Sequence, residues 1–110
     1  MPIIDFNSAF NTLKTGVINL AESELKNYVA QASADGQALL DTMKNDLQNW
    51  TQQLAAGQIT KDDFTFNVLS EKDSLEMAAL EQAGLAAIQV DQFKADVMTL
   101  ITTTITALVP

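Results

Sequence analysis

Acidic side chains are the only abundant ionisable groups in this sequence, and several of them gather in its second half. The 110-residue chain has 14 Asp and Glu residues against 6 Lys, and it has no Arg, His or Cys. The gathered carboxylates are Asp62, Asp63, Glu71, Asp73, Glu76 and Glu81. Carboxylates in such a cluster can hold calcium or an iron pair, or act in pairs as general acid and base on glycosides.

The two metal sites lack residues here, and glycoside hydrolysis needs a sugar-binding cleft, which long helical hairpins rarely supply. A di-iron site in a helical bundle uses Glu-x-x-His pairs, and the chain has no His. A calcium loop needs alternating Asp or Asn ligands around a central Gly, and the stretch from Asp62 to Asp73 has neither. The helix macrodipole attracts acids to helix N-termini, which accounts for Asp62, Asp63 and Glu76 without a ligand. We therefore expect no metal and no cofactor.

Nucleophilic catalysis and phosphate binding lack their residues as well. No His can activate a Ser or Thr, and no Gly-x-Ser-x-Gly sequence is present. Gly16, Gly36, Gly57 and Gly84 are each isolated, so no Gly-rich phosphate loop is expected. The net charge of −8 disfavours nucleic acid, because phosphate contacts require clustered cations. We expect a protein that is not an enzyme and binds no nucleic acid.

Apolar residues at helical spacing run through the whole first half. The stripe comprises Phe6, Phe10, Leu13, Val17, Ala21, Leu25, Tyr28, Ala32, Gly36, Leu39, Met43, Leu47, Trp50 and Leu54. Its mean step is about 3.7 residues, and Pro occurs only at the two ends of the chain, so the pattern predicts one helix over about 5–56. The weak point is Asp35-Gly36, where the alternative is a break into two helices. In a continuous helix, Gly36 would let a neighbouring helix approach closely.

The second half contains clearer turn signals. Gly57 suits the left-handed residue that follows a helix, and Thr60 with Asp63 forms an acidic variant of the capping box. These signals predict a short helix over about 61–69, with Phe64 and Val68 on one side. After the turn at 70–74, a helix over about 74–109 repeats the mean step of about 3.7 residues.

The two long helices therefore have matched periods, which suits antiparallel pairing. We predict an all-α fold with a single domain over 1–110. Its architecture is a long antiparallel helical hairpin with a short connecting helix.

The C-terminal segment carries no charged side chain after Asp96. It is too short and too rich in Thr for a membrane span, which needs about 20 apolar residues. The β-branched residues from Ile101 to Ile105 suit a strand, but the helical spacing of apolar and Thr positions favours a helix. An uncharged, amphipathic end also suits contact with lipid.

Apolar residues lie on more than one face of the expected helices, so one hairpin leaves apolar surface uncovered. A homodimer forming a four-helix bundle would cover it; a monomer broken at Gly36 and folded back is the alternative. Small and apolar residues of the last helix form the expected interface: Ala79, Ala83, Gly84, Ala86, Val90, Phe93, Val97, Ile101 and Ile105.

The function expected from this pattern is a non-enzymatic structural or protein-interaction module that self-associates through apolar helix faces. The alternative is a lipid-binding or apolar-ligand-binding protein whose amphipathic helices associate peripherally with membranes. The segment from Met1 to Phe6 lacks the basic and apolar regions of a secretory signal, so a cytoplasmic location is expected.

Overall fold

The chain forms helices over most of its length, but it turns more often than the apolar stripe predicts. The computed structural model describes residues 5–109. Its elements are α1 (Phe6–Glu24), α2 (Val29–Ala55), α3 (Lys61–Ser70), the 3-10 helix η1 (Lys72–Ser74), α4 (Ala78–Gln82) and α5 (Ala87–Thr106). No strand occurs over 5–109, so the predicted all-α class is confirmed.

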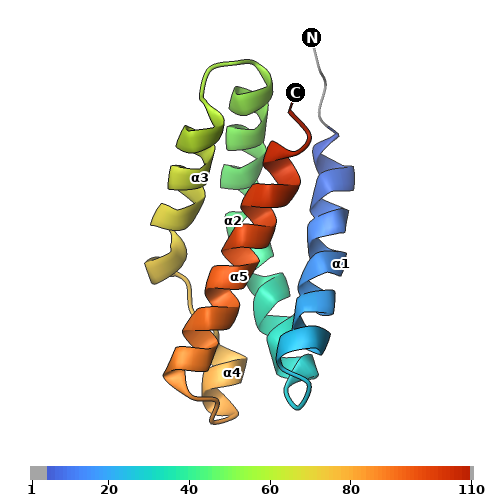
Figure 1. Ribbon diagram of the computed structural model, residues 1–110, viewed down its shortest axis with the longest axis vertical. Coiled ribbons are helices and arrows are strands. Elements are labelled where there is room, and N and C mark those ends of the chain that lie inside the picture. Colours follow the sequence, from blue (N-terminus) through green and yellow to red (C-terminus); the bar gives the residue numbers. More distant parts are fainter. Residues whose placement is uncertain (1–4, 110) are drawn as a thin grey trace.

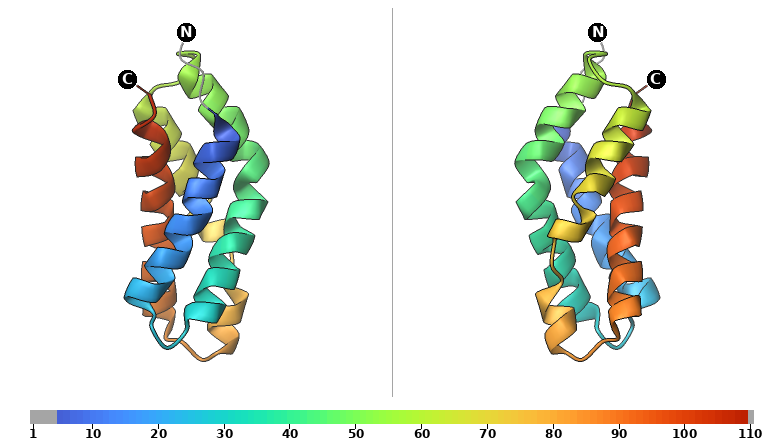
Figure 2. Two further views of the ribbon diagram at one scale, coloured as in Figure 1. Left: turned by 90° about the vertical axis from the view of Figure 1, so that its right-hand side faces the viewer. Right: turned by 90° about the vertical axis from the view of Figure 1, so that its left-hand side faces the viewer.

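The long helices lie side by side along one axis of the molecule (Figure 1). α1 runs antiparallel to α2 and also packs against α5, while α3 packs against α2 and α5 (Figure 2). The molecule measures 46 × 23 × 19 Å. Each α-helix contributes a fully buried side chain to one core, as Leu13, Met43, Phe64, Leu80 and Ile101 illustrate. None of the helices within 5–109 is long and apolar enough to cross a membrane.

The predicted single helix over 5–56 is wrong, because the chain reverses at Leu25–Tyr28. The Tyr28 N–H donates to the Leu25 carbonyl at 2.8 Å, with Lys26 and Asn27 as the central turn residues. Leu25 is buried, so the stripe stays on the core side when α1 folds back on α2. The spacing of the apolar residues correctly identified the buried face of both helices. Because this spacing continues unchanged through Leu25–Tyr28, it gave no indication that the chain reverses there.

Gly36 lies inside α2, not at a break, and it brings α1 and α2 close together. A Cβ added at Gly36 would lie 2.2 Å from Val17 Cγ1, well inside contact distance. The predicted role of Gly36, close approach of a neighbouring helix, is therefore confirmed. The neighbour is the preceding helix of the same chain.

The turn signals of the second half are confirmed at Gly57 and Thr60. Gly57 has a φ of 76°, and the N–H groups of Gly57 and Gln58 donate back to the last turn of α2, as in a Schellman motif. Thr60 and Asp63 make both hydrogen bonds of a capping box, each at 3.0 Å. α3 begins directly after this cap.

The predicted helix over 74–109 is wrong, because a turn at Gly84 divides it into α4 and α5. Gly84 has a φ of 86°, and the N–H groups of Gly84 and Leu85 donate to the carbonyls of Glu81 and Leu80 in a second Schellman motif. Gly84 therefore ends a helix instead of forming part of a close helix crossing. The C-terminal segment is helical through Thr106, as predicted, and not a strand.

Asp35 of α2 caps the N-terminus of α4 with its side chain. Asp35 is 7% exposed, and its carboxylate accepts hydrogen bonds from the backbone N–H groups of Ala79 (2.9 Å) and Leu80 (2.7 Å). These N–H groups belong to the first turn of α4, which has no capping side chain of its own. A buried carboxylate is stable here because charged acceptors make strong bonds with free helix N–H groups.

Candidate functional site

The α5 members of the expected interface lie inside the chain's own core. Val90, Phe93, Val97, Ile101 and Ile105 are all buried. α5 packs them against α1, α2 and α3 of the same chain. In this fold the contacts that the stripe of α5 requires are made within one chain.

The remaining members of the expected interface surround the turn between α4 and α5. Ala79 and Ala83 are half-buried, while Gly84 and Ala86 are exposed. The structure therefore does not bring the whole expected set onto one surface.

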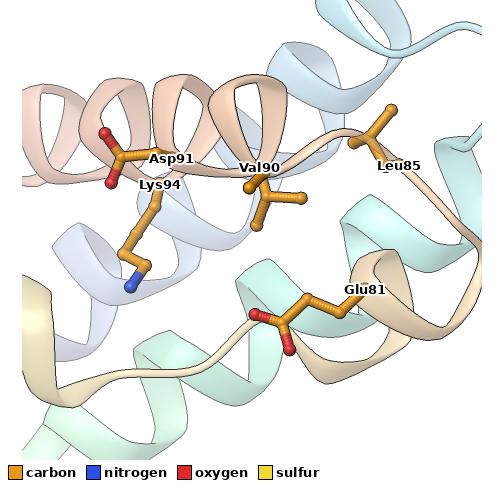
Figure 3. A pocket seen from close by; sticks show the side chains of 6 residues that line it. Glu81, Leu85, Val90, Asp91 and Lys94 are labelled. Atoms are coloured by element: carbon orange, nitrogen blue, oxygen red, sulfur yellow. The ribbon is translucent and has the colours of Figure 1, made fainter.

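A cleft of about 380 Å³ lies between α4 and the start of α5 (Figure 3). It is lined by Glu81, Leu85, Ala87, Val90, Asp91 and Lys94. Figure 3 shows the carboxylates of Glu81 and Asp91 pointing apart, so they do not form a pair that could share a proton or a substrate atom.

Two charged groups of this cleft, Asp91 and Lys94, are bonded to the segment that precedes α4. Lys94 Nζ donates to the Lys72 carbonyl at 3.0 Å and also to the Leu75 carbonyl. Asp91 pairs with Lys72, with 3.3 Å between Nζ and Oδ1. These bonds tie η1 to α5, which makes the cleft a structural junction. Over residues 5–109 no group of three or more metal-ligand side chains gathers in one place.

Two pairs of acidic side chains join helices that are far apart in the sequence. Glu24 at the end of α1 lies beside Asp96 of α5, and Glu71 after α3 lies beside Asp46 of α2. Partial removal from water, together with the hydrogen bond and negative charge of the neighbouring Asp, raises the pKa of each Glu from 4.5 to about 7. Sequence reasoning missed both pairs because their partners are separated by many residues and no local pattern links them.

The outer side of α3 carries the most unusual surface of the molecule. Phe64 and Val68 point into the core and are fully buried, as predicted, whereas Phe66 is 72% exposed and Leu69 is 47% exposed. At 3.6 residues per turn, Phe66 lies opposite the buried pair. The exposed Asp62 lies one turn before Phe66. We call Asp62, Phe66 and Leu69 the α3 face.

Sequence reasoning did not single out the α3 face. A signal was present, because a Phe out of phase with the two buried residues of a short helix must point outward. Other large apolar side chains with substantial exposure are Ile18, Ile88 and Leu108. Ile18 lies in α1, Ile88 at the start of α5 and Leu108 after its end, whereas Phe66 and Leu69 are neighbours one turn apart.

No protein-family model, curated protein or solved structure matches this chain. Function must therefore be inferred from the surface over residues 5–109. In the cleft between α4 and α5, Lys94 is bonded to the backbone of the same chain, and the acidic pairs lie between helices. The α3 face carries two large exposed apolar side chains one turn apart, Phe66 and Leu69.

Proposed function

We propose that the chain is a non-enzymatic structural or protein-interaction module that self-associates through an apolar helix face, and that the α3 face contacts the second copy. The observation that supports this proposal is the 72% exposure of Phe66 on the side of α3 opposite the core. Burying such a side chain stabilises a complex by about 1.5–3 kcal/mol. Phe is also among the residue types enriched in protein interfaces.

A two-fold arrangement of two α3 helices suits this face. In such an interface the same residues contact each other across the axis, so Phe66, near the middle of α3, would meet its copy.

The proposed homodimer joins two all-α globules. Each chain already folds α1 back on α2 and covers its own stripe. A four-helix bundle of two long hairpins would require the chains to open first.

Gel filtration with light scattering tests the proposal. We expect wild-type protein to elute with the mass of two 11.9 kDa chains at tens of micromolar. The variant Phe66→Ser should elute as one chain. The matched control Ile88→Ser, which alters another strongly exposed apolar side chain on α5, should keep the dimer mass. Wild-type protein with the mass of one chain would overturn the proposal.

The alternative function, peripheral binding of lipid, would use the α3 face as well. Of the apolar residues of the C-terminal segment that suggested lipid contact, Val97, Ile101 and Ile105 are buried and Leu108 is 47% exposed. Asp62 on the α3 face and the neighbouring Asp63 disfavour an anionic membrane. Flotation of wild-type protein with neutral phosphatidylcholine vesicles, lost in Phe66→Ser, would favour lipid over a second copy.

A further inference from the structure

We infer that the turn between α1 and α2 is a hinge through which two copies of the chain exchange their α1 helices. In the exchanged dimer, residues 6–55 of each chain form one helix, and α1 of one copy packs on α2 and α5 of the other. The inference concerns self-association, as the proposed function does. It rests on different residues, and exchange requires the chains to open, so protein that was never unfolded tests the α3 face and refolded protein tests the exchange.

The hinge is the reversal of the chain that no residue enforces. Gly57 and Gly84, at two other turns, hold left-handed backbone angles and carry Schellman hydrogen bonds. The segment Leu25–Tyr28 contains neither Gly nor Pro, and no residue in it has a positive φ. A single turn hydrogen bond, from Tyr28 N to Leu25 O, closes it. Each of its residues can adopt helical angles, so the turn can straighten at small cost.

The apolar stripe keeps its helical phase across the hinge. Ala21, Leu25, Tyr28 and Ala32 follow one another at steps of three or four residues. When the turn straightens, α1 and α2 therefore become one helix with an unbroken apolar side. The closed turn does not require this phase, because two helices joined by a turn need only be amphipathic separately.

The register between α1 and α2 is symmetric about the hinge. Val17 lies as many residues before Lys26 as Gly36 lies after Asn27, and a Cβ added at Gly36 would meet the Val17 side chain. Two straightened chains can therefore lie antiparallel with the two-fold axis at their hinges. Val17 of each chain then meets Gly36 of the other in the same register, which is the condition for a closed, isologous dimer.

The contacts of α1 do not depend on which chain supplies the helix. Besides Val17 on Gly36, they include Gly16 against Leu100 of α5 and the Gln37 side chain donating to the Lys14 carbonyl at 3.2 Å. The exchanged dimer preserves all of them and differs from the closed chain at the hinge alone. Exchange of this kind is a low-cost route to a dimer. Its extent should rise with protein concentration.

A disulfide between α1 and α2 reports the exchange directly. The Cβ added at Gly36 lies 3.5 Å from Val17 Cβ, within the range of about 3.5–4.5 Å that disulfides need. The chain has no Cys, so Val17→Cys with Gly36→Cys gives a single possible pair. We would refold this variant from denaturant at high protein concentration, oxidise it and analyse it on a non-reducing denaturing gel.

The expected result is a covalent dimer band that disappears with reductant. A dimer held by the α3 face alone leaves each disulfide within one chain and gives only a single-chain band. Single-chain bands with a dimer mass in solution would thus overturn the exchange while leaving the proposed function standing. Interchain bands that persist in Phe66→Ser would support the exchange independently of the α3 face.

Two substitutions at Lys26, added to the cysteine pair, test the hinge itself. Lys26 is exposed at the second position of the turn, its φ is not positive and its N–H makes no hydrogen bond within residues 5–109, so we expect the closed turn to tolerate Lys26→Pro. In a straight helix the same Pro would remove a hydrogen bond and clash at both hinges of the dimer, weakening dimerisation roughly 10⁴-fold. The matched control Lys26→Ala removes the same charge but favours the straight helix.

We expect Lys26→Pro to abolish the interchain band and Lys26→Ala to strengthen it. An interchain band of equal intensity in all three proteins would overturn the hinge. The absence of an interchain band from both the parent and Lys26→Ala would overturn the exchange.

Discussion

Replacement of Gly36 by Ala should destabilise the protein, although Ala is the better helix former. The new methyl group would lie 2.2 Å from Val17 Cγ1, against a favourable carbon–carbon separation of about 3.5–4.0 Å. Val17 is β-branched and restricted at χ1 within a helix, so the two helices must move apart. Overpacking costs about 1–3 kcal/mol and the gain in helix propensity is about 1 kcal/mol. With so deep an overlap we expect a net loss of about 1–2 kcal/mol.

Urea unfolding followed by circular dichroism would measure this loss of free energy directly. Thermal unfolding should show it as a fall of about 5–10 °C in Tm. Gly16→Ala is the matched control, because its new methyl group meets only the side chain of Leu100, with Cδ2 at 2.9 Å and Cδ1 at 3.2 Å, the end of a flexible side chain. We expect Gly16→Ala to change stability little. Val17→Ala combined with Gly36→Ala should be less destabilised than the sum of the two single variants. A Gly36→Ala protein as stable as wild type would refute the close approach.

Two further predictions concern carboxyl groups. Asp35→Asn places an amide NH₂ against a backbone N–H of α4. We expect the free energy of unfolding in urea to fall by about 1–3 kcal/mol and hydrogen exchange in α4 to become faster. Unchanged hydrogen exchange in α4 would contradict the capping role of Asp35. Glu24 and Glu71 have pKa values raised from 4.5 to about 7, so the folded state binds their protons more tightly than the unfolded state does. This contribution to stability is fully present below pH 4.5 and is lost as the pH rises to about 7. The variants Glu24→Gln and Glu71→Gln should each weaken this loss, and identical urea midpoints for wild type and variants at about pH 5 and pH 8 would contradict the raised pKa values.

Local patterns in the sequence predict much of the fold, because they depend on neighbouring residues. The step of three or four residues identified side chains that are buried in the structure, from Leu13 and Val17 to Phe93 and Ile101. The Thr60 cap was readable for the same reason, since its partner lies three residues away. Helix propensity and the absence of internal Pro predicted an all-α chain without any tertiary information.

The reversal at Leu25 and the division at Gly84 were not readable in this way. At Leu25 the chain turns without Gly or Pro, and the advantage of turning comes from α1 packing on residues far along the chain. Gly84 was visible, but a glycine in a stretch of small residues fits a helix crossing as well as a helix end. The bond from Asp35 to Leu80 and the α3 face around Phe66 likewise depend on the tertiary fold.

The apolar stripe determines which side chains are buried but not which chain buries them. Val17 can meet Gly36 of its own chain through the turn, or Gly36 of a second copy through a straight hinge, with the same contact in both cases. Whether the protein is a monomer or an exchanged dimer then depends on two quantities. One is the small free-energy difference between a turn and a helix over Leu25–Tyr28, and the other is the protein concentration. One Pro changes this free-energy difference by about 3 kcal/mol per hinge, which is large compared with the difference itself. The residues with the greatest influence on assembly are therefore exposed ones such as Lys26, which contribute nothing to the core.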